Sequence, residues 1–283
     1  MSDREDLMIP GNSGRLSVRT KGLASRPAQV VVLVQGANLS GQAGFDFGFD
    51  GGRDYSLMDA LAARGLGTVT FAVRGYAGSD VPPDPLAIDT DAAIEDLVTV
   101  VDWVAARGFP RPHVAGWSWG GRIVARFAEQ YPDRLSRLAL LDPALGGNQT
   151  GVTPTEDWFS GDWNWWHEGR LVTKFAEPAA RKALADFVVA HEPRSPAGIR
   201  AENARGTIAA DPRHIECPTL MLYGSDAARQ DYMQGGIPRA EFFERLAARD
   251  KAFVIVPDCG DYAHLEIPRR CIQRSLADFL LQA

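Results

Sequence analysis

The sequence has few cysteines and no long apolar run. Its three cysteines, Cys217, Cys259 and Cys271, are odd in number and lack the spacing of a metal site, among 283 residues. We therefore expect free, packing thiols, with no disulfide framework and no metal. No apolar stretch approaches the roughly 20 residues that a membrane-spanning helix needs, so we expect no membrane span.

Positive charge is also scarce. Lysine and arginine number 30 against 36 acidic residues, which gives a formal net charge of -6, and no basic cluster interleaves with aromatic residues. A nucleic-acid partner is therefore not expected. The first residues, "MSDREDLMIP", carry three acids before any apolar run, whereas a secretory signal begins with positive charge and continues with about 7 to 15 apolar residues. These features predict a cytoplasmic protein.

What the sequence does have is an alternation of buried strands and helices. The β-branched run "QVVVLVQG" (29–36) is typical of a strand covered on both faces, and a helical pattern (56–65) and a second strand (67–73) follow. The same order recurs to the last helix, at 268–281. This predicts an α/β fold with a mostly parallel sheet between two helical layers. Sites in such sheets lie at the carboxyl ends of the strands.

One interval breaks this rhythm. Residues 146–216 contain two helical patterns and are rich in tryptophan, and we interpret them as an inserted, mainly helical cap. The core is then formed by 1–145 and 217–283. Because a cap lines the path of the substrate, its tryptophans and one beside the serine described next are candidates for substrate contact, with packing as the alternative. They are Trp117, Trp158, Trp163, Trp165 and Trp166.

The strongest chemical motif is Gly-Trp-Ser-Trp-Gly at 116–120, between a strand and a helix. A nucleophilic serine needs a sharp turn that lifts its hydroxyl clear of the sheet, and small residues two positions away let neighbouring backbone approach. A structural glycine turn is the alternative interpretation. The position between strand and helix favours Ser118 as a nucleophile.

A serine hydroxyl is a weak nucleophile, so it needs a base and usually a carboxylate that orients the base. In the order serine, acid, histidine, the strand "LMLYGSD" ends at Asp226, and His264 follows the strand "AFVIVPD". We therefore predict a triad of Ser118, Asp226 and His264. Asp231 and Asp142 are alternatives for the acid.

The chain resembles the α/β-hydrolase family over nearly its whole length. The features that carry the resemblance are "VLVQGA", "VRGYAGSD", "GWSWGG", "LMLYGSD" and "DYAHLEIP". The resemblance implies an oxyanion hole formed by the backbone amides of Ala37 and Trp119, with Asn38 as the alternative to Ala37. Where that family normally has His-Gly, this chain has Gln35-Gly36. The resemblance implies no cofactor.

The histidine motif departs from the commoner form of that family, in which the base follows glycine directly. After Gly260 this chain has Asp261, and His264 comes three residues later. A second form of the motif, with tyrosine, a small residue, histidine, leucine and an acid, is similar to "YAHLE". The resemblance therefore assigns the base to His264, and Asp261 remains an alternative partner of the imidazole.

Together these features predict a serine hydrolase that acts on a small-molecule ester or lactone through an acyl-enzyme. The alternatives are an amide or carbon–carbon bond hydrolase of the same fold, or a non-catalytic protein that binds a small molecule. The sequence does not define the substrate or the oligomeric state.

Overall fold

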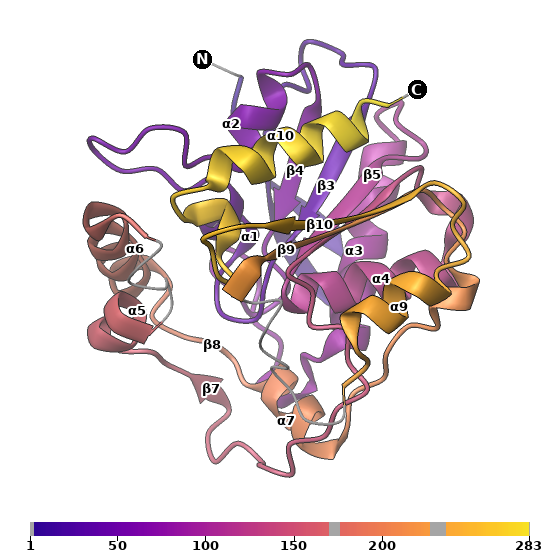
Figure 1. Cartoon of the computed structure of the whole chain (residues 1–283). Helices are drawn as coiled ribbons and strands as arrows, with labels where there is room; N and C mark the ends of the chain where they lie inside the picture. The colour runs from indigo at the N-terminus through magenta and orange to yellow at the C-terminus, as the bar shows by residue number, and fades with distance from the viewer. Residues whose placement is uncertain (1–2, 170–175, 227–235, 283) are drawn as a thin grey trace.

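The centre of the molecule is one eight-stranded sheet. The computed structural model describes residues 3–169, 176–226 and 236–282. The strands follow the order β1-β2-β4-β3-β5-β6-β9-β10, and Figure 1 shows β4, β3, β5, β9 and β10 in the middle of the fold. They are β1 (Glu5–Gly11), β2 (Gly14–Lys21), β3 (Val30–Val34), β4 (Gly67–Phe71), β5 (His113–Trp117), β6 (Leu138–Leu141), β9 (Thr219–Gly224) and β10 (Lys251–Val256).

Most of the sheet is parallel. Strands β4, β3, β5, β6, β9 and β10 pair in parallel, whereas β1 and β2 form an antiparallel hairpin that joins β4. The central strands β3 and β5 are buried at every position, as expected for strands covered on both faces. The predicted α/β fold is therefore confirmed.

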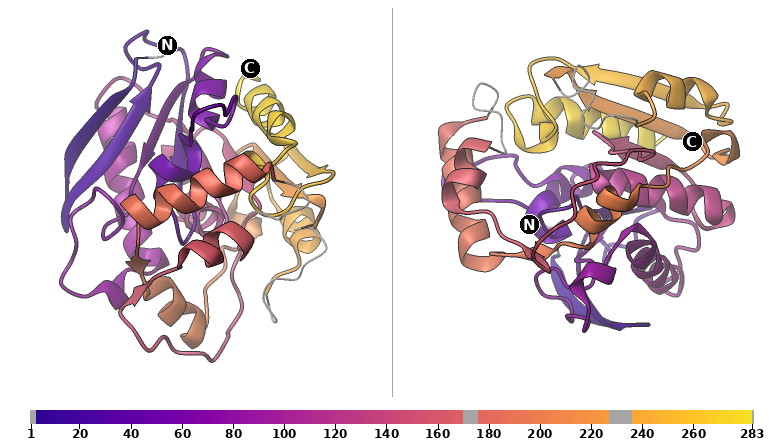
Figure 2. Two further views of the ribbon diagram at one scale, coloured as in Figure 1. Left: turned by 90° about the vertical axis from the view of Figure 1, so that its left-hand side faces the viewer. Right: turned by 90° about the horizontal axis from the view of Figure 1, so that it is seen from below.

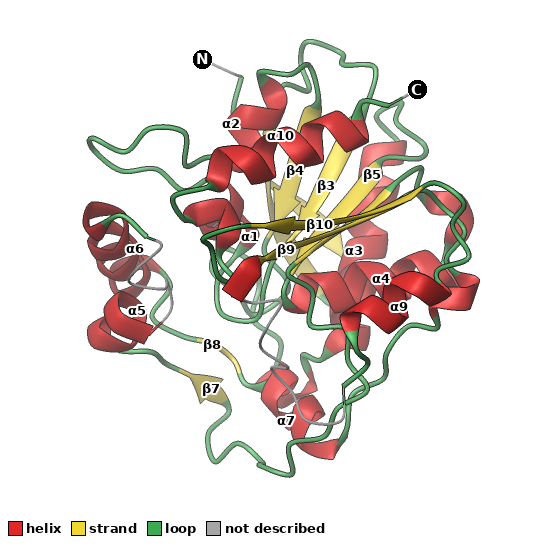
Figure 3. Ribbon diagram, in the orientation of Figure 1, coloured by secondary structure: helices red, strands yellow, loops and turns green. Residues whose placement is uncertain are grey.

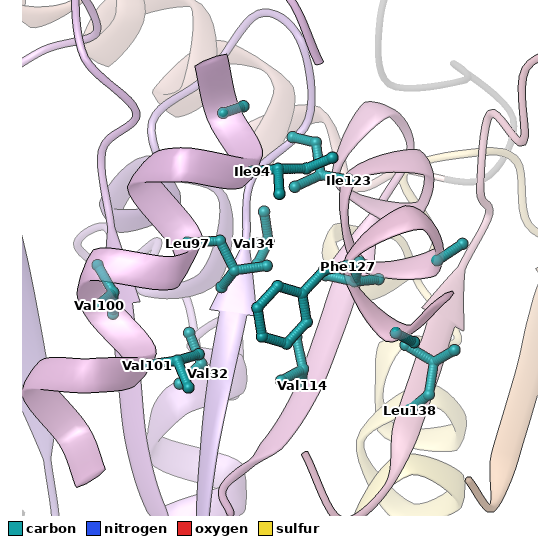
Figure 4. Close-up of a cluster of buried hydrophobic side chains, with 14 of the residues drawn as sticks. Val32, Val34, Ile94, Leu97, Val100, Val101, Val114, Ile123, Phe127 and Leu138 are labelled. Atoms are coloured by element: carbon teal, nitrogen blue, oxygen red, sulfur yellow. The ribbon is translucent and has the colours of Figure 1, made fainter. Parts of the chain in front are cut away.

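Helices cover both faces of the sheet, so the apolar core has two halves (Figure 3). One half packs α3 (Thr90–Ala105), α4 (Trp119–Gln130) and α9 (Arg239–Arg245) against the sheet. The other packs α1 (Gly41–Phe45), α2 (Leu57–Ala62) and α10 (Arg269–Leu280). Figure 4 shows the first half, where Leu97 and Phe127 meet Val34 and Val114. Short 3-10 turns lie at η1 (Pro85–Ala87), η2 (Pro132–Arg134) and η4 (Ala263–Leu265).

The segment between β6 and β9 has its own elements. They are β7 (Trp158–Phe159), α5 (Trp163–Gly169), α6 (Pro178–His191), β8 (Ser195–Pro196), α7 (Gly198–Arg205) and η3 (Pro212–His214). Helices α5 and α6 pack together to one side of the sheet, and α7 lies apart from them (Figures 1 and 2). The sequence patterns indicated helices at α6 and α7, but not at α5.

Two buried carboxylates attach this segment to the rest of the fold. Glu192, just after α6, accepts hydrogen bonds from the amide (2.8 Å) and the hydroxyl (2.5 Å) of Ser40. Glu202 on α7 accepts bonds from the amide and hydroxyl of Thr90 at the start of α3. No helix in the described ranges is long and apolar enough to cross a membrane.

Candidate active site

Ser118 occupies a strained turn between β5 and α4. Its backbone angles are φ 55 and ψ −116, a left-handed conformation that costs a non-glycine residue on the order of 1–3 kcal/mol. The turn needs glycine on both sides. A Cβ on Gly116 would lie 2.2 Å from the Gly120 carbonyl oxygen, and one on Gly120 would lie 2.2 Å from that of Val34. The sequence therefore specifies the turn as well as its serine.

Ser118 lies on the wall of a cavity of about 240 Å³. The cavity is at the carboxyl ends of the parallel strands, as expected for a sheet of this kind. Two arginines, Arg122 and Arg239, and two carboxylates, Asp142 and Asp261, share the wall with the serine. Ile199 and Asn203 of α7 also line the cavity.

The two amides proposed from sequence, those of Ala37 and Trp119, belong to residues of the same wall. Neither amide donates a hydrogen bond to any residue that the structure describes. The Trp119 amide is also the first of α4, where helix geometry leaves N–H groups without an intrahelical acceptor. The loop at Ala37 is held by the Tyr76 hydroxyl, which donates to the Ala37 carbonyl (2.7 Å).

Neighbours of Ala37 have structural contacts. The Gln35 side chain is buried and its Oε1 accepts a hydrogen bond from the Val73 amide (3.0 Å). The Asn38 side chain accepts one from Arg200 (3.0 Å) and does not line the cavity. Gln35 therefore anchors the end of β3, two residues before Ala37, to the Val73 backbone.

His264 is buried and does not line this cavity. It lies in η4, and its ring packs 5.6 Å from the Phe45 ring and 4.7 Å from the Trp117 ring, centroid to centroid. Its Nε2 has no hydrogen-bond partner among the described residues. Burial lowers the pKa of His264 to about 3, and a backbone hydrogen bond to Gly44 only partly opposes this shift. The ring is therefore neutral at physiological pH and packed in the core.

Asp226 does not reach the wall of the cavity either. It follows β9, is half-buried, and its amide donates to the Cys259 carbonyl (3.0 Å). Of the three residues predicted as a triad, the described structure thus brings only Ser118 to the cavity. Asp231, an alternative acid, lies outside the described residues.

The other two alternative acids are both at the cavity. Asp142 follows β6 with a left-handed φ of 40, and its Oδ1 accepts a hydrogen bond from the Gly224 amide (2.8 Å). Burial raises the pKa of Asp142 well above its ordinary value, and the charges of Asp261 and Glu266 add to this rise. The Gly224 hydrogen bond and the charge of Arg239 oppose it. Asp142 is therefore protonated over a wider pH range than an exposed aspartate.

Asp261 is placed by its backbone. It follows β10, and its carbonyl accepts a hydrogen bond from the Trp117 indole (2.6 Å). The preceding Gly260 amide donates to the Glu266 carboxylate (2.5 Å), which closes the loop onto itself. The half-buried Asp261 side chain then lies at the cavity, at the motif position directly after glycine.

Arg122 is a site residue that the sequence patterns did not indicate. It is almost wholly buried, its Nε donates to the Ala144 carbonyl (3.1 Å), and its Nη1 donates to Glu202 (3.3 Å). Burial lowers its pKa, and Glu202 opposes this change. Sequence spacing could have indicated it, because Arg122 follows Ser118 by four residues, about one helical turn. Arg239 and Asn203 carried no comparable signal.

None of the five tryptophans proposed for substrate contact lines this cavity. Trp117 is buried on the other face of the sheet against Tyr262, and Trp165 packs edge-on against Trp166. Trp163 stacks on His167, and Trp158 lies under Arg194 beside a separate surface hollow. In the described structure these side chains pack, and the wall toward the insertion comes from α7.

Among the residues that the structure describes, no group of three or more histidine, cysteine, aspartate or glutamate side chains could hold a metal ion. The chemistry available at the cavity is therefore that of a hydroxyl, two carboxylates, two guanidinium groups and backbone amides.

Comparison with known proteins places the chain among hydrolases. Residues 29–188 match the family described as the alpha/beta hydrolase fold. The chain is 24% identical over 215 residues to the pimeloyl-[acyl-carrier protein] methyl ester esterase of Nitrosomonas europaea, which covers 64% of this chain and 77% of that protein. It is 34% identical over 99 residues to the human (lyso)-N-acylphosphatidylethanolamine lipase, a match to 34% of this chain and 28% of the lipase.

Solved structures share the fold at low identity. The enol-lactonase of Burkholderia xenovorans superimposes with a TM-score of 0.68 at 17% identity, covering 98% of this chain and 100% of that one. Epoxide hydrolase A of Mycobacterium thermoresistibile superimposes with a TM-score of 0.66 at 18% identity, covering 98% of each chain. At such identities these likenesses show the fold alone.

Proposed function

The chain belongs to the α/β-hydrolase fold family, and from this premise we propose that it is a hydrolase that cleaves a small carboxylic ester or lactone at the Ser118 cavity. The observation that carries the proposal is the strained Ser118 turn on the cavity wall. Strain of this kind persists only where the surrounding structure enforces it, and it concentrates at functional sites. A structural serine in a glycine turn has no need of it.

Ser118 Oγ attacks the carbonyl carbon, and the amides of Ala37 and Trp119 stabilise the oxyanion that forms. Each preorganised donor of this kind contributes on the order of 3 kcal/mol in the transition state. Expulsion of the alcohol leaves an acyl-enzyme, which water then hydrolyses. Both steps are acyl transfers, so the proposal needs no cofactor.

The cavity volume of about 240 Å³ favours a small acyl group, since it lies below the usual range of roughly 300–1,000 Å³ for drug-sized ligands. Ile199 and Asn203 enclose the site from α7. We therefore assign residues 146–216 the role of a cap, exerted through α7 rather than through the tryptophans. The methyl ester esterase and enol-lactonase among the similar proteins support an ester or lactone as the substrate class.

The mechanism needs a general base that accepts the Ser118 proton. The triad expected from sequence gives that role to His264, oriented by Asp226. In that assignment the Nε2 of His264, which has no hydrogen-bond partner among the described residues, accepts the Ser118 proton. Asp142 and Asp261, which line the cavity, remain the alternatives to Asp226.

A non-catalytic protein that binds a small molecule is the second candidate. The observation that favours it is that no histidine of the described ranges lines the Ser118 cavity. Such a protein would use the two arginines and two carboxylates of the wall to hold a ligand without turnover.

The test is hydrolysis of a panel of aryl esters, alkyl esters and lactones, with Ser118→Ala as the inactive variant and Trp158→Phe, beside the other hollow, as the matched control. We expect turnover by the wild type and by Trp158→Phe, loss with Ser118→Ala, and an acyl adduct on the Ser118 peptide after acid quenching. Equal turnover by Ser118→Ala contradicts the proposal. Binding of panel compounds without turnover favours the second candidate.

A further inference from the structure

The guanidinium group of Arg122 is tied to the Ser118 turn through one backbone residue. Its Nε donates to the Ala144 carbonyl (3.1 Å), and the Ala144 amide donates to the Ser118 carbonyl (2.9 Å). Arg122 lies about one turn of α4 beyond Ser118, and helical side chains lean toward the N-terminus of their helix. The guanidinium group is therefore fixed close to Ser118, in the cavity that both residues line.

Arg122 has more donors than acceptors. Its side chain is only 1% exposed, and a guanidinium group carries five N–H donors. Nε uses one of them on Ala144, and Nη1 uses two, on Glu202 and on the Asn203 Oδ1 (both 3.3 Å). The two N–H groups of Nη2 donate to none of the residues that the structure describes. Because buried N–H groups are rarely left without an acceptor, Nη2 is a site for an acceptor group of a ligand.

Asn203 of α7 adds a neighbouring donor. Its Oδ1 accepts the hydrogen bond from Arg122 Nη1, so its other amide atom, Nδ2, is a donor. Nδ2 bonds to no residue within the described ranges, and Asn203 lines the cavity together with Arg122 and Ser118. Two side chains from α4 and α7, joined by a hydrogen bond, thus bring N–H donors to the same cavity.

The positive charge of Arg122 is only partly compensated. Glu202 pairs with it at 3.3 Å, but the other carboxylate oxygen of Glu202 accepts two hydrogen bonds from Thr90. Burial lowers the pKa of Arg122, and Glu202 opposes this change without reversing it. An additional anion beside the guanidinium group is therefore favoured.

The other charged side chains of the cavity wall include both signs. Burial raises the pKa of Asp142 and so favours its neutral form, and Asp261 and Arg239 act on Asp142 with opposite signs. These residues compensate one another, so the cavity favours an incoming anion mainly at Arg122.

From this geometry we infer that Arg122 and Asn203 form a subsite for a free carboxylate group of the substrate. The hydrolase then acts on small esters or lactones that carry a second, ionised acid. One carboxylate accepts hydrogen bonds from Arg122 Nη2 and from Asn203 Nδ2, because the planar guanidinium fork matches the geometry of a carboxylate. The inference rests on the proposed function, since it names the substrate class of the same site.

The position of the subsite limits the length of the substrate. Because Arg122 is about one helical turn, roughly 5 Å, from Ser118, the acid and the scissile carbonyl are separated by a short chain. The cavity volume of about 240 Å³ agrees with such a molecule. The acid can belong to the acyl group, as in a monoester of a short dicarboxylic acid, or to the alcohol.

The test compares matched substrates that differ only in charge. For the acyl side the pair is monomethyl glutarate and its neutral amide, methyl 5-amino-5-oxopentanoate. For the alcohol side it is 3-acetoxypropanoate and 3-acetoxypropanamide. Charge-assisted hydrogen bonds typically contribute about 1.5–3 kcal/mol, so we expect wild-type kcat/KM to favour the acid of one pair by about 10–100-fold. The pair that shows this preference identifies the side that bears the acid.

Two variants remove the subsite in different ways. Asn203→Asp keeps an oxygen acceptor for Arg122 but replaces the Nδ2 donor with a negative charge, and Arg122→Gln removes the guanidinium group. Both should abolish the preference for the acid and leave kcat/KM for the neutral amide within about threefold. The loss should appear in KM rather than in kcat, because the subsite binds the ground state and the transition state alike. Arg64→Gln, an exposed arginine after α2, is the matched control and should keep the preference.

The neutral substrate also controls for folding, because a variant with a damaged fold loses activity on both members of a pair. A wild type that cleaves the acid and the amide equally well overturns the subsite and leaves the proposed hydrolase intact. The same conclusion follows if Arg122→Gln and Asn203→Asp both keep the preference for the acid.

A readout independent of turnover is calorimetric binding of the same substrates to Ser118→Ala. We expect the acid of the preferred pair to bind at least about tenfold more tightly than its amide, and the double variant Ser118→Ala/Asn203→Asp to lose this difference. Equal binding of acid and amide overturns the subsite even if the wild type cleaves esters. Selective binding of the acid by a protein that cleaves none of the four esters supports the subsite and contradicts the proposed function.

Discussion

Glu202 on α7 accepts two hydrogen bonds from Thr90, one from the amide (2.9 Å) and one from the hydroxyl (2.6 Å). The Thr90 hydroxyl in turn accepts a bond from the Trp119 indole (3.0 Å), and Glu202 also pairs with buried Arg122 (3.3 Å). One carboxylate therefore joins the inserted segment to the helix that begins at the Ser118 turn.

Removal of this carboxylate is predicted to destabilise the fold. Glu202→Ala leaves the Arg122 charge buried without its partner, a change that typically costs about 3–5 kcal/mol. Glu202→Gln keeps an oxygen acceptor and should cost less. Urea unfolding measures both, with Glu244→Ala, an exposed carboxylate of α9, as the control. A loss of under about 1 kcal/mol in Glu202→Ala contradicts this account of α7.

Much of the fold could be predicted from the sequence, because its signals are local. Continuous apolar runs such as 30–34 and 220–222 indicated buried strands, and the glycines around Ser118 indicated a sharp turn. Helix α5 gave no such signal. Its seven residues contain three tryptophans, of which only Trp166 is buried, and the helix packs against α6 rather than presenting a periodic apolar face to the sheet.

The site was harder to predict because burial depends on distant segments. The stretch "YAHLE" suits a base at the cavity as well as a core histidine. The residues that pack on the His264 ring, Phe45 and Trp117, are far away in sequence, so no local pattern reveals this packing. Asp142 was recognised as an alternative acid from its place after a strand. Its proximity to Asp261 depends on the neighbouring ends of β6, β9 and β10, which no local pattern encodes.

The strain at Ser118 predicts that two inactive variants, Ser118→Gly and Ser118→Ala, differ in folding stability. Alanine retains the cost of the left-handed backbone (φ 55), whereas glycine adopts it freely. Ser118→Gly should therefore be more stable than Ser118→Ala by about 1 kcal/mol, even though glycine gains more backbone freedom in the unfolded state. Denaturant unfolding of the two variants decides the point. Equal stability, or greater stability of the alanine variant, means that the turn is not strained.

Asp142 predicts a stability that falls with rising pH. Because the folded state raises its pKa, the folded protein binds this proton more tightly than the unfolded chain does. The stabilisation is complete below the unfolded pKa and is lost as pH rises through the folded one. Asp142→Asn removes the effect and should be more stable than the wild type at neutral pH by about 1–3 kcal/mol. Chemical unfolding at several pH values measures this, and a constant difference between the two proteins contradicts it.

For His264 we predict the opposite dependence, in which the stability of the fold decreases as pH falls. Its pKa of about 3 in the folded state lies below the ordinary value of 6.5, so between these values the unfolded chain carries a proton that the folded protein does not. Stability should then decrease as pH falls through this window, by about 1.4 kcal/mol per pH unit for one group. His113, whose pKa is lowered to about 4, contributes in the same direction.

His264→Gln should remove the His264 share of this acid sensitivity and leave that of His113, so its stability falls less steeply with acid than that of the wild type. His113→Gln, away from the cavity, is the matched variant and should remove the other share. Unfolding free energies measured from mildly acidic to neutral pH give the slopes directly. A wild-type slope that His264→Gln leaves unchanged means that the imidazole is already accessible to protons in the folded state. An imidazole of near-ordinary pKa would suit the base of the triad expected from sequence.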